Sequence, residues 1–459
     1  MYKLNFNKKE SVHFIGIGGI SMSGLAEILI DKGFKVSGSD QKENSLTDSL
    51  TKKGAKISYP QSENNIKDDT DFFVYTAAIH PDNPEFKKAK ETGKPMLTRA
   101  ELLGEIMEHY ENSIAISGTH GKTTTTSMIS EVLLEAALSP TISVGGIIPS
   151  IQSNIHLGSS DIFVTEACEY TDSFLSFYPK YTIVLNIDAE HLDYFKNLEN
   201  ERKSFRKFLH NTKPHGAIYI NGSIENVDIL TEGVHEKIIK FGLSEDFDCY
   251  AKDITYDKNG HPSFIPIYNK KEYDRITLSV PGLHNVVNSL SAIALLIDIK
   301  VPYEKIKKGL LNFKGANRRF QYKGSLKNGA VIVDDYAHHP TEIRASLLAA
   351  LKTVHKRIIV CFQPHTYTRT KAFLHDFAES LSIADVVVLS DIYAAREKDI
   401  YNISSLDIKK LLDEKGKECY YFHTFSEIEK FLLKFSNNGD LLITMGAGDI
   451  VNVGEDLLK

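Results

Sequence analysis

The sequence has 459 residues, a length typical of about three domains. Hydrophobic residues make up 42% and charged residues 25%, which is a globular composition and excludes fibrous, coiled-coil and disordered chains. The formal net charge of −6 provides no overall positive field, which argues against nucleic acid as a partner. The cysteines are widely spaced, and no apolar run reaches the roughly 18 residues of a membrane span. We therefore expect a cytoplasmic protein that binds neither nucleic acid nor membrane.

Short apolar runs alternate with amphipathic segments over most of the chain, which predicts an α/β fold built on parallel sheets. A helix is expected over 22–32, closed by Gly33, and a longer one over 122–138. Asn259-Gly260 predicts a hairpin, and hence an antiparallel excursion within 247–278. The expected strands are 12–15, 35–37, 71–75, 113–117, 162–165, 182–185, 331–333, 357–362, 386–389 and 441–444.

These patterns divide the chain into three α/β domains, with boundaries near Glu111 and Ala316. Residues 1–111 are expected to form a Rossmann-like domain. Residues 112–316 would form a central parallel-sheet domain with the antiparallel excursion. Residues 317–459 would form a second Rossmann-like domain.

A glycine-rich turn follows the first expected strand and contains Gly16, Gly18, Gly19 and Gly24. Glycine lets backbone N–H groups approach a diphosphate at a helix N-terminus. Asp40, at the end of the second strand, occupies the position that holds a ribose hydroxyl in dinucleotide folds. The spacing departs from GxGxxG, so the turn fits NAD, a UDP-type diphosphate or close packing alone.

A second candidate phosphate site follows the strand 113–117 and opens the long helix. Lys122 would bridge the β- and γ-phosphate oxygens, and the Thr123 hydroxyl would face Mg²⁺. The strict GxxxxGK[ST] pattern is not met, because its first position falls on Ile116. The shortened loop still predicts an ATP site, formed by Gly118, Thr119, His120, Gly121, Lys122, Thr123 and Thr124.

Candidate magnesium ligands follow two further strands. Segment 161–166 ends in Glu166, with Glu169 as the competing carboxylate. Segment 186–191 ends in His191, which could bind the metal or be an ordinary loop or core histidine.

Together these segments resemble the Mur ligase family, whose members form amide bonds with ATP in peptidoglycan synthesis. HFIGIGGISMSGLA (13–26) and DDYAHHP (334–340) are typical of the alanine-adding branch. The resemblance spans nearly the whole chain and also rests on VSGSD (36–40), YTAAIHPDNPE (75–85), GTHGKTTTT (118–126), EACE (166–169), NIDAEH (186–191), PGLHNVVNSLSAIA (281–294), RRF (318–320), QPHTYTRT (363–370) and MGAGDI (445–450).

The resemblance implies that UDP-N-acetylmuramic acid and L-alanine are joined through an acyl phosphate, with ATP and Mg²⁺, by a monomer or weak homodimer. It implies a metal site at Thr123, Glu166 and His191. The sugar nucleotide would contact Gly18, Gly19, Ser23, Asp40 and Thr76. Beyond the phosphate loop, ATP would contact His284, Asn288, Arg318, Arg319, Asp335 and Tyr336.

The resemblance also implies an amino-acid site at His365 and Arg369. Many members read QPHRYSRT where this chain has Thr366, so Arg369 is the expected carboxylate anchor. His338 is a candidate for the base that deprotonates the amine. The expected catalytic residues are Lys122, Glu166, His191, His338 and Arg369. Sibling ligases carry a carbamylated lysine that corresponds by position to Arg206, so we expect no such modification.

Four other functions are weaker. An NAD-dependent oxidoreductase would leave the phosphate loop and Glu166 without a role, and a non-catalytic nucleotide-binding regulator has no need of Lys122, Thr123 and Glu166 together. A recycling ligase that attaches a whole peptide is disfavoured by GIGGISMSG. A zinc hydrolase built on His338-His339 lacks a third ligand at workable spacing.

Overall fold

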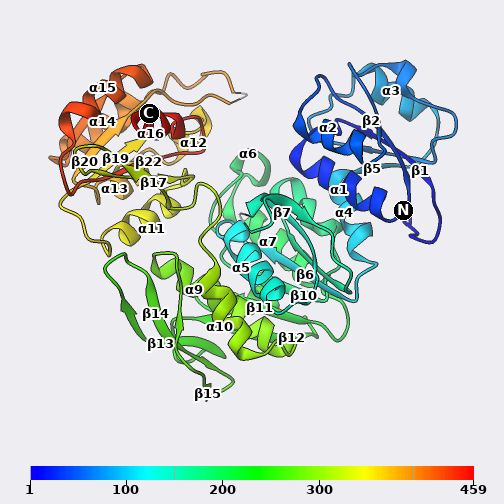
Figure 1. Ribbon diagram of the computed structural model, residues 1–459, viewed down its shortest axis with the longest axis horizontal. Helices are drawn as coiled ribbons and strands as arrows, with labels where there is room; N and C mark the ends of the chain where they lie inside the picture. Colours follow the sequence, from blue (N-terminus) through cyan, green and yellow to red (C-terminus); the bar gives the residue numbers. More distant parts are fainter. Residues whose placement is uncertain (1, 149, 396) are drawn as a thin grey trace. The chain divides into compact units, whose positions relative to one another are not determined.

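The computed structural model describes residues 2–148, 150–395 and 397–459 (Figure 1). The chain forms two compact units, and each contains helices packed on mainly parallel sheets, which confirms the expected α/β class. Unit 1 comprises Met1–Tyr250, Tyr268–Lys270 and Asn288–Gly309. Unit 2 comprises Ala251–Ile267, Lys271–Val287 and Leu310–Lys459.

The amino-terminal part of unit 1 contains β1 (Ser11–Ile15), α1 (Ile20–Asp31), β2 (Lys35–Ser39), α2 (Ser45–Lys52), β3 (Lys56–Ser58), η1 (Glu63–Asn65), β4 (Phe72–Tyr75), α3 (Pro84–Glu91), β5 (Met96–Thr98) and α4 (Arg99–Met107). The strands form a parallel sheet in the order β3-β2-β1-β4-β5. Val12 and Phe14 pack in the core that contains α1 and α4, whereas Ile15 packs in a separate core with α3. The chain changes direction across the sheet between β1 and β4, which opens a crevice at their carboxyl ends.

The central part of unit 1 contains β6 (Asn112–Ser117), α5 (Lys122–Glu135), β7 (Thr141–Ile148), β8 (Ser153–His156), β9 (Ile162–Glu166), η2 (Tyr170–Ser176), β10 (Tyr181–Val184), α6 (Leu192–Phe195), α7 (Leu198–Leu209), β11 (Ala217–Asn221), α8 (Val227–Thr231) and β12 (Lys237–Gly242). The sheet order is β12-β11-β10-β6-β9-β7-β8, with every pair parallel except β7–β8. Because β6 lies between β9 and β10, the segments that follow these three strands meet at one edge.

Two expected helices differ from the structure at their ends. The first starts at Ile20 rather than at residue 22. The long helix α5 ends at Glu135, three residues before the expected end at Leu138, because Ala137 adopts a left-handed φ of 55°. The helices α9 (Leu283–Asp298) and α10 (Tyr303–Asn312) cross the division between the units.

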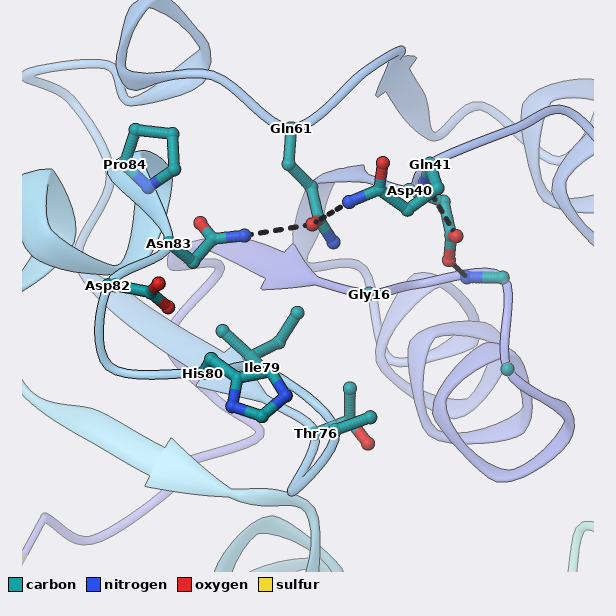
Figure 2. Close-up of a pocket in the computed structure, with 13 residues that line it drawn as sticks. Gly16, Asp40, Gln41, Gln61, Thr76, Ile79, His80, Asp82, Asn83 and Pro84 are labelled. Atoms are coloured by element: carbon teal, nitrogen blue, oxygen red, sulfur yellow. Dashed lines mark hydrogen bonds between the residues drawn. The ribbon is translucent and has the colours of Figure 1, made fainter. Parts of the chain in front are cut away.

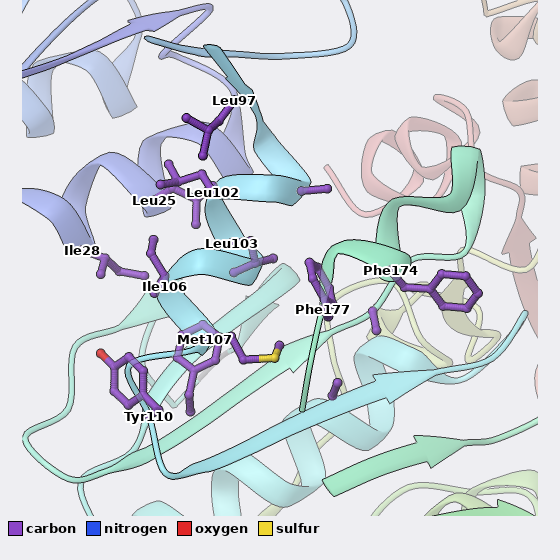
Figure 3. Packing of buried hydrophobic residues seen from close by; sticks show 14 of the residues in the cluster. Leu25, Ile28, Leu97, Leu102, Leu103, Ile106, Met107, Tyr110, Phe174 and Phe177 are labelled. Atoms are coloured by element: carbon purple, nitrogen blue, oxygen red, sulfur yellow. The ribbon is translucent and has the colours of Figure 1, made fainter. Parts of the chain in front are cut away.

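The two parts of unit 1 share a hydrophobic core (Figure 3). Leucines and isoleucines of α1 and α4 pack in the same cluster as Phe174 and Phe177, from and beside η2. A methyl group on Gly104 of α4 would lie 2.1 Å from the Ser176 carbonyl oxygen, so the backbones approach too closely for any side chain there.

We expect Gly104→Ala to destabilise unit 1, because the new Cβ meets backbone that must shift. The loss in the free energy of unfolding should be about 1–3 kcal/mol. The matched control is Gly24→Ala on α1, where the nearest atom would lie 3.4 Å away and helix propensity favours alanine by up to about 1 kcal/mol. Urea unfolding of both variants measures the difference, and equal midpoints would contradict the expectation.

Unit 2 is built mainly on a sheet in the order β17-β18-β22-β19-β20-β21, parallel except for β17–β18. Alternate residues of β19 enter two cores: Ile358 and Val360 pack with α11, α13 and α14, whereas Ile359 packs with α15 and α16. The helices and strands of this part of unit 2 are β17 (Gln321–Ser325), β18 (Val331–Asp335), α11 (Pro340–Ala350), β19 (Ile358–Phe362), α12 (Tyr367–Ala372), α13 (Leu374–Leu381), β20 (Val386–Leu389), α14 (Ser405–Glu414), β21 (Glu418–Tyr421), α15 (Phe425–Phe435), β22 (Leu441–Met445) and α16 (Val451–Leu457).

The expected hairpin is confirmed. Strands β13 (Cys249–Tyr256) and β14 (Pro262–Tyr268) are neighbours, and Gly260 lies in the turn between them with a φ of 76°. Strand β15 (Lys271–Glu272) borders β14, and β16 (Ile276–Thr277) pairs with it antiparallel. Across the described ranges of the chain, we find no helix with the length and hydropathy of a membrane span.

Candidate functional site

A cavity of about 600 Å³ opens at the crevice between β1 and β4 (Figure 2). Four of the five residues predicted to bind the sugar nucleotide line it: Gly18, Gly19, Asp40 and Thr76. The fifth, Ser23, is buried in α1, where its hydroxyl donates to the Ile20 carbonyl at 2.9 Å and does not line the cavity. Ser23 was chosen through the family resemblance, and its contact with the sugar nucleotide stays a prediction.

The polar wall of this cavity is built by side chains from three loops. Asp40 accepts hydrogen bonds from the backbone N–H groups of Gly18 and Gln41, both at 2.7 Å, and so fixes the glycine turn. The Gln61 side-chain oxygen accepts from Gln41 at 2.7 Å and from Asn83 at 2.9 Å (Figure 2). The cavity thus offers backbone N–H groups near Gly18 and an amide cluster at Gln61, which suits a nucleotide diphosphate with a polar base.

The second site lies where β6 passes into α5. Gly121 caps the helix with a φ of 86°, and a side chain there would meet Asn288, so glycine is required on both grounds. Asn288, which was expected to contact ATP, is thereby placed beside the phosphate loop. The loop is the strand-to-helix turn that the sequence predicted.

Lys122 is held over the loop by its own backbone and by a buried carboxylate. Its Nζ donates to the Gly118 and Thr119 carbonyl oxygens at 2.6 and 3.1 Å and to the two Glu169 oxygens at 3.1 and 2.9 Å. Burial would lower the pKa of Lys122, but the negative charge of Glu169 outweighs it and the pKa is raised. The ammonium is therefore charged at neutral pH and is held at the phosphate loop. His191 also contacts Glu169, at 3.7 Å.

Glu166 and Thr123, two of the three predicted metal ligands, border one glycine pair. Glu166 accepts a hydrogen bond from the Gly145 N–H at 2.8 Å, and a Cβ on Gly145 would lie 3.2 Å from its other oxygen. A Cβ on Gly146 would lie 3.3 Å from the Thr123 methyl group. One carboxylate with a hydroxyl side chain nearby is a donor set that suits Mg²⁺, which takes one or two carboxylates and completes its shell with water and phosphate. The described residues contain no preformed group of three His, Cys, Asp or Glu side chains suited to a metal.

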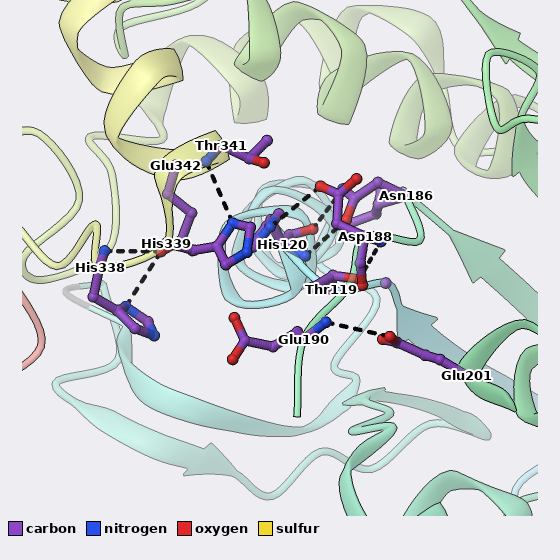
Figure 4. A network of polar contacts seen from close by, with 12 residues as sticks. Thr119, His120, Asn186, Asp188, Glu190, Glu201, His338, His339, Thr341 and Glu342 are labelled. Atoms are coloured by element: carbon purple, nitrogen blue, oxygen red, sulfur yellow. Dashed lines mark hydrogen bonds and ion pairs between the residues drawn. The ribbon is translucent and has the colours of Figure 1, made fainter. Parts of the chain in front are cut away.

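The segment after β10 clasps the phosphate loop (Figure 4). The Asn186 side chain accepts a hydrogen bond from the His120 N–H at 2.8 Å and donates one to the His120 carbonyl oxygen at 3.0 Å. Asp188 pairs with the His120 ring at 3.3 Å. Behind this segment, Glu201 accepts from the Glu190 N–H at 3.3 Å. Burial, with the nearby Glu169 and Glu190 charges, raises the pKa of Glu201 to about 8.

His284 lies in unit 2 and is predicted to contact ATP. His284 is exposed at the start of α9, so a ligand can reach its imidazole ring.

Arg318 and Arg319 play different parts in unit 2. The Arg318 guanidinium donates to Asp334 at 2.9 Å and to the carbonyls of Gly446 and Gly448 at 2.7 and 3.1 Å, all within the unit. Arg319 pairs with Glu342 at 3.4 Å. Both guanidinium groups lie over the Tyr336 ring, 5.0 and 5.4 Å from its centre. Arg318 thus joins its own segment to strand β18 and to the loop after β22.

Asp335, at the end of β18, is a buried acceptor. It accepts from the Ala337 N–H at 2.8 Å and from the Ser346 hydroxyl at 2.6 Å. Burial raises its pKa to about 6 despite these donors. Its backbone position at the carboxyl end of a parallel strand is the one expected for a nucleotide contact, while its side chain holds the loop that carries His338.

The predicted amino-acid residues converge at the carboxyl ends of β18 and β19. The His338 and His365 rings are 5.8 Å apart, and Arg369 Nη1 lies 3.0 Å from His365 Nδ1. His338 Nδ1 faces two acceptors, the Tyr336 carbonyl at 2.9 Å and Glu342 at 3.2 Å, which places its proton on Nδ1 and leaves Nε2 as the basic nitrogen (Figure 4).

Thr366 stands where many relatives have arginine, and the structure gives it a backbone task. It adopts a φ of 64°, which is rare for a β-branched residue, and its hydroxyl accepts from the Arg369 N–H at 3.4 Å. Thr366 therefore caps α12 and orients Arg369 rather than supplying a second cation.

Three residues that help to form the site were not predicted from the sequence. Glu169 was named only as a competitor of Glu166, yet it is the carboxylate that holds Lys122. Glu342 orients His338, and the spacing of four residues was its available signal. Gly145, which bonds Glu166, carried no signal beyond being part of a glycine pair.

A phosphate loop with an anchored lysine, at the carboxyl edge of a parallel sheet in a chain with two further α/β sheets, defines a multidomain phosphate-binding protein. The chain belongs to the Mur ligase family. Residues 11–111 match the model described as Mur ligase family, catalytic domain, residues 116–296 the Mur ligase middle domain, and residues 318–448 the Mur ligase, glutamate ligase domain.

Individual relatives agree over the full length. The chain is 59% identical to a UDP-N-acetylmuramate–L-alanine ligase of Agathobacter rectalis and 56% identical to one of Lachnospira eligens, each alignment covering 100% of both chains. It resembles the crystal structure of a UDP-N-acetylmuramate–alanine ligase from Thermotoga maritima, with a TM-score of 0.79, 30% identity and 98% of each chain covered. A murein peptide ligase from Psychrobacter arcticus shares the fold, with a TM-score of 0.67, 23% identity and 98% of each chain covered.

Proposed function

We propose that this chain joins the lactyl carboxylate of UDP-N-acetylmuramic acid to the amine of L-alanine and converts ATP to ADP and phosphate, in peptidoglycan precursor synthesis. The observation that carries the proposal is the charged Lys122, fixed by Glu169 above the loop, with Glu166 and Thr123 beside it. The relatives that bear this name at more than half identity over their full length support it.

The first step transfers the γ-phosphoryl group. A carboxylate oxygen attacks the γ-phosphorus, the bond to the bridging oxygen breaks, and ADP leaves, so that an acyl phosphate forms. Two anions must meet for this, and Lys122 offsets their repulsion while the loop N–H groups hold the phosphates. Mg²⁺, held by Glu166 and Thr123 with His191 close by, would supply further charge neutralisation when bound.

The second step forms the amide. Arg369 and His365 would hold the alanine carboxylate, because a guanidinium binds that group through two parallel bonds. The His338 Nε2 would accept the ammonium proton, after which the amine attacks the acyl carbon, the bond to the phosphate oxygen breaks, and the leaving phosphate takes the second proton from the nitrogen. Glu342 orients His338 for this task through the bond at Nδ1.

We propose that residues 1–111 bind the sugar nucleotide, residues 112–316 bind ATP and residues 317–459 bind the amino acid. The protein would act in the cytoplasm as a monomer or weak homodimer. The free thiols of all four cysteines agree with a reducing compartment.

Phosphate release from ATP tests the function, with UDP-N-acetylmuramic acid present and one amino acid added at a time. We expect release with L-alanine and other small amino acids, and ADP as the nucleotide product. Omission of the sugar nucleotide should abolish release. Equal turnover without it, release of AMP, or a preference for a short peptide over alanine would overturn the proposal.

We expect Arg369→Lys to raise the KM for L-alanine by about 10- to 100-fold, because lysine keeps the charge but loses the two-pronged geometry. The KM for the sugar nucleotide should change little. Arg344→Lys, at an exposed position of α11, is the matched control and should match the parent enzyme. Initial rates at varied alanine measure the effect, and an equal rise in both KM values would count against an amino-acid role.

A further inference from the structure

Arg99, the first residue of α4, carries a partly buried guanidinium with little to bind. Within the described part of the chain, its guanidinium donates one hydrogen bond, from Nη1 to the Ser21 hydroxyl at 3.1 Å. Among the residues that the structure describes, Arg99 has no carboxylate partner in an ion pair. A cation in such a place is costly unless an anion completes its environment.

The electrostatic surroundings of Arg99 tie it to the phosphate-loop region. Burial lowers its pKa, and the negative charge of Glu166, at the end of β9, opposes this effect. Through Ser21, Arg99 contacts the first turn of α1, directly after the glycine turn.

The β7–β8 hairpin closes the same region. Its Asn154 side chain donates to the Ile20 carbonyl at 3.1 Å, next to Ser21, and its Gly145 N–H donates to Glu166 at 2.8 Å. The β7–β8 hairpin thus contacts both the start of α1, directly after the glycine turn, and Glu166. Ser21, Arg99 and Glu166 are each partly exposed, so a ligand can reach them.

We infer that Arg99 binds the lactyl carboxylate of the sugar nucleotide and delivers it to the ATP site. The inference rests on the proposed function and deepens it. The backbone N–H groups of the glycine turn already provide for the diphosphate, whereas no other residue assigned above binds the reacting carboxylate. That carboxylate must stop next to Glu166, and a guanidinium at this point offsets the repulsion between the two anions and fixes the attacking oxygen through two parallel bonds.

The test compares two sugar nucleotides in the full chain by calorimetry, without ATP or metal. UDP-N-acetylmuramic acid carries the lactyl group, and UDP-N-acetylglucosamine lacks it. Arg99→Gln should weaken binding of the first by about 10- to 100-fold and leave binding of the second nearly unchanged. Arg99→Lys should recover part of the loss. The matched control is Arg206→Gln, which removes an arginine of α7 that pairs with Glu232 at the surface.

Two outcomes would overturn the inference while the proposed function stands. Equal weakening for both sugar nucleotides would place Arg99 on the diphosphate or the sugar, and unchanged binding of both would deny it any contact. In either case the parent chain would still bind UDP-N-acetylmuramic acid and release phosphate with alanine. Failure of the parent chain itself to bind that nucleotide would overturn the proposed function. Thermal unfolding of each variant confirms that the comparison is made on folded protein.

Discussion

Phosphate release by the Lys122→Ala variant should fall by about 10³-fold, the size of effect seen when a preorganised charged donor is removed from a transition state. Lys122 is fixed by two carbonyl oxygens of its own loop and by Glu169, so its charge is already positioned at the loop before γ-phosphate charge develops. Its raised pKa keeps it charged at working pH. Because the bond strengthens as the phosphoryl group transfers, kcat should fall more than the affinity for ATP.

The matched control is a lysine of α10 that pairs with the other end of helix α5. Lys308 pairs with Glu135, the last residue of α5, at 2.9 Å on the surface, and Lys308→Ala should leave the rate near that of the parent enzyme. Steady-state phosphate release with saturating substrates measures both variants, and thermal unfolding verifies that they fold. A rate for Lys122→Ala within tenfold of the parent would refute the role given to this lysine.

Glu85→Ala should lower the free energy of unfolding by about 3–5 kcal/mol, as when one partner of a buried polar pair is removed. The Glu85 carboxyl is fully buried and lies 2.6 Å from His13 Nε2. It also accepts from the Ser62 N–H at 3.0 Å and from Asn65 at 3.2 Å. Alanine would leave the buried His13 ring without this partner and would remove an acceptor from the partly buried Ser62 and Asn65 groups, so that desolvation is no longer offset by these bonds.

Glu91→Ala is the control for this prediction. Glu91 ends the same helix, α3, but is exposed and pairs with Lys88 at 3.3 Å, so its loss should cost less than about 1 kcal/mol. Urea unfolding provides the comparison. Glu85→Ala should also weaken UDP binding, because Ser62 and Asn83 flank the segments that carry Gln61 and the cavity wall. Similar unfolding midpoints for the two variants would contradict the buried-pair explanation.

Several core strands of the fold could be predicted because their apolar runs are continuous and bounded by turn residues, whereas the interior strands β7 and β11 were not predicted. Strands such as β6, β19 and β22 appear where expected. The edge strands β3 and β5 were not foreseen, since three residues each are too few to show a period. Strand β17 was also missed, because its alternation is irregular and a bulge lies near Gly324.

Within the candidate site, residues that belong to a local motif were found and residues that act across the fold were not. Lys122 and Thr123 follow from one short loop. Which of Glu166 and Glu169 faces the lysine depends on how the chain turns after β9, and that turn has no distinctive local pattern. The weak contact of Arg99 with its surroundings is a property of three-dimensional burial and could not be read from neighbours in sequence.

The continuous core that α1 and α4 share with Phe174 and Phe177 has a practical consequence for dissecting this molecule. A fragment cut after residue 111 would carry Leu102, Ile106 and Met107 into water, since the surface that covers them would be missing. Such a fragment should be prone to aggregate on its own. Recombinant pieces meant for studying nucleotide recognition are better cut so that both sheets of unit 1 are retained.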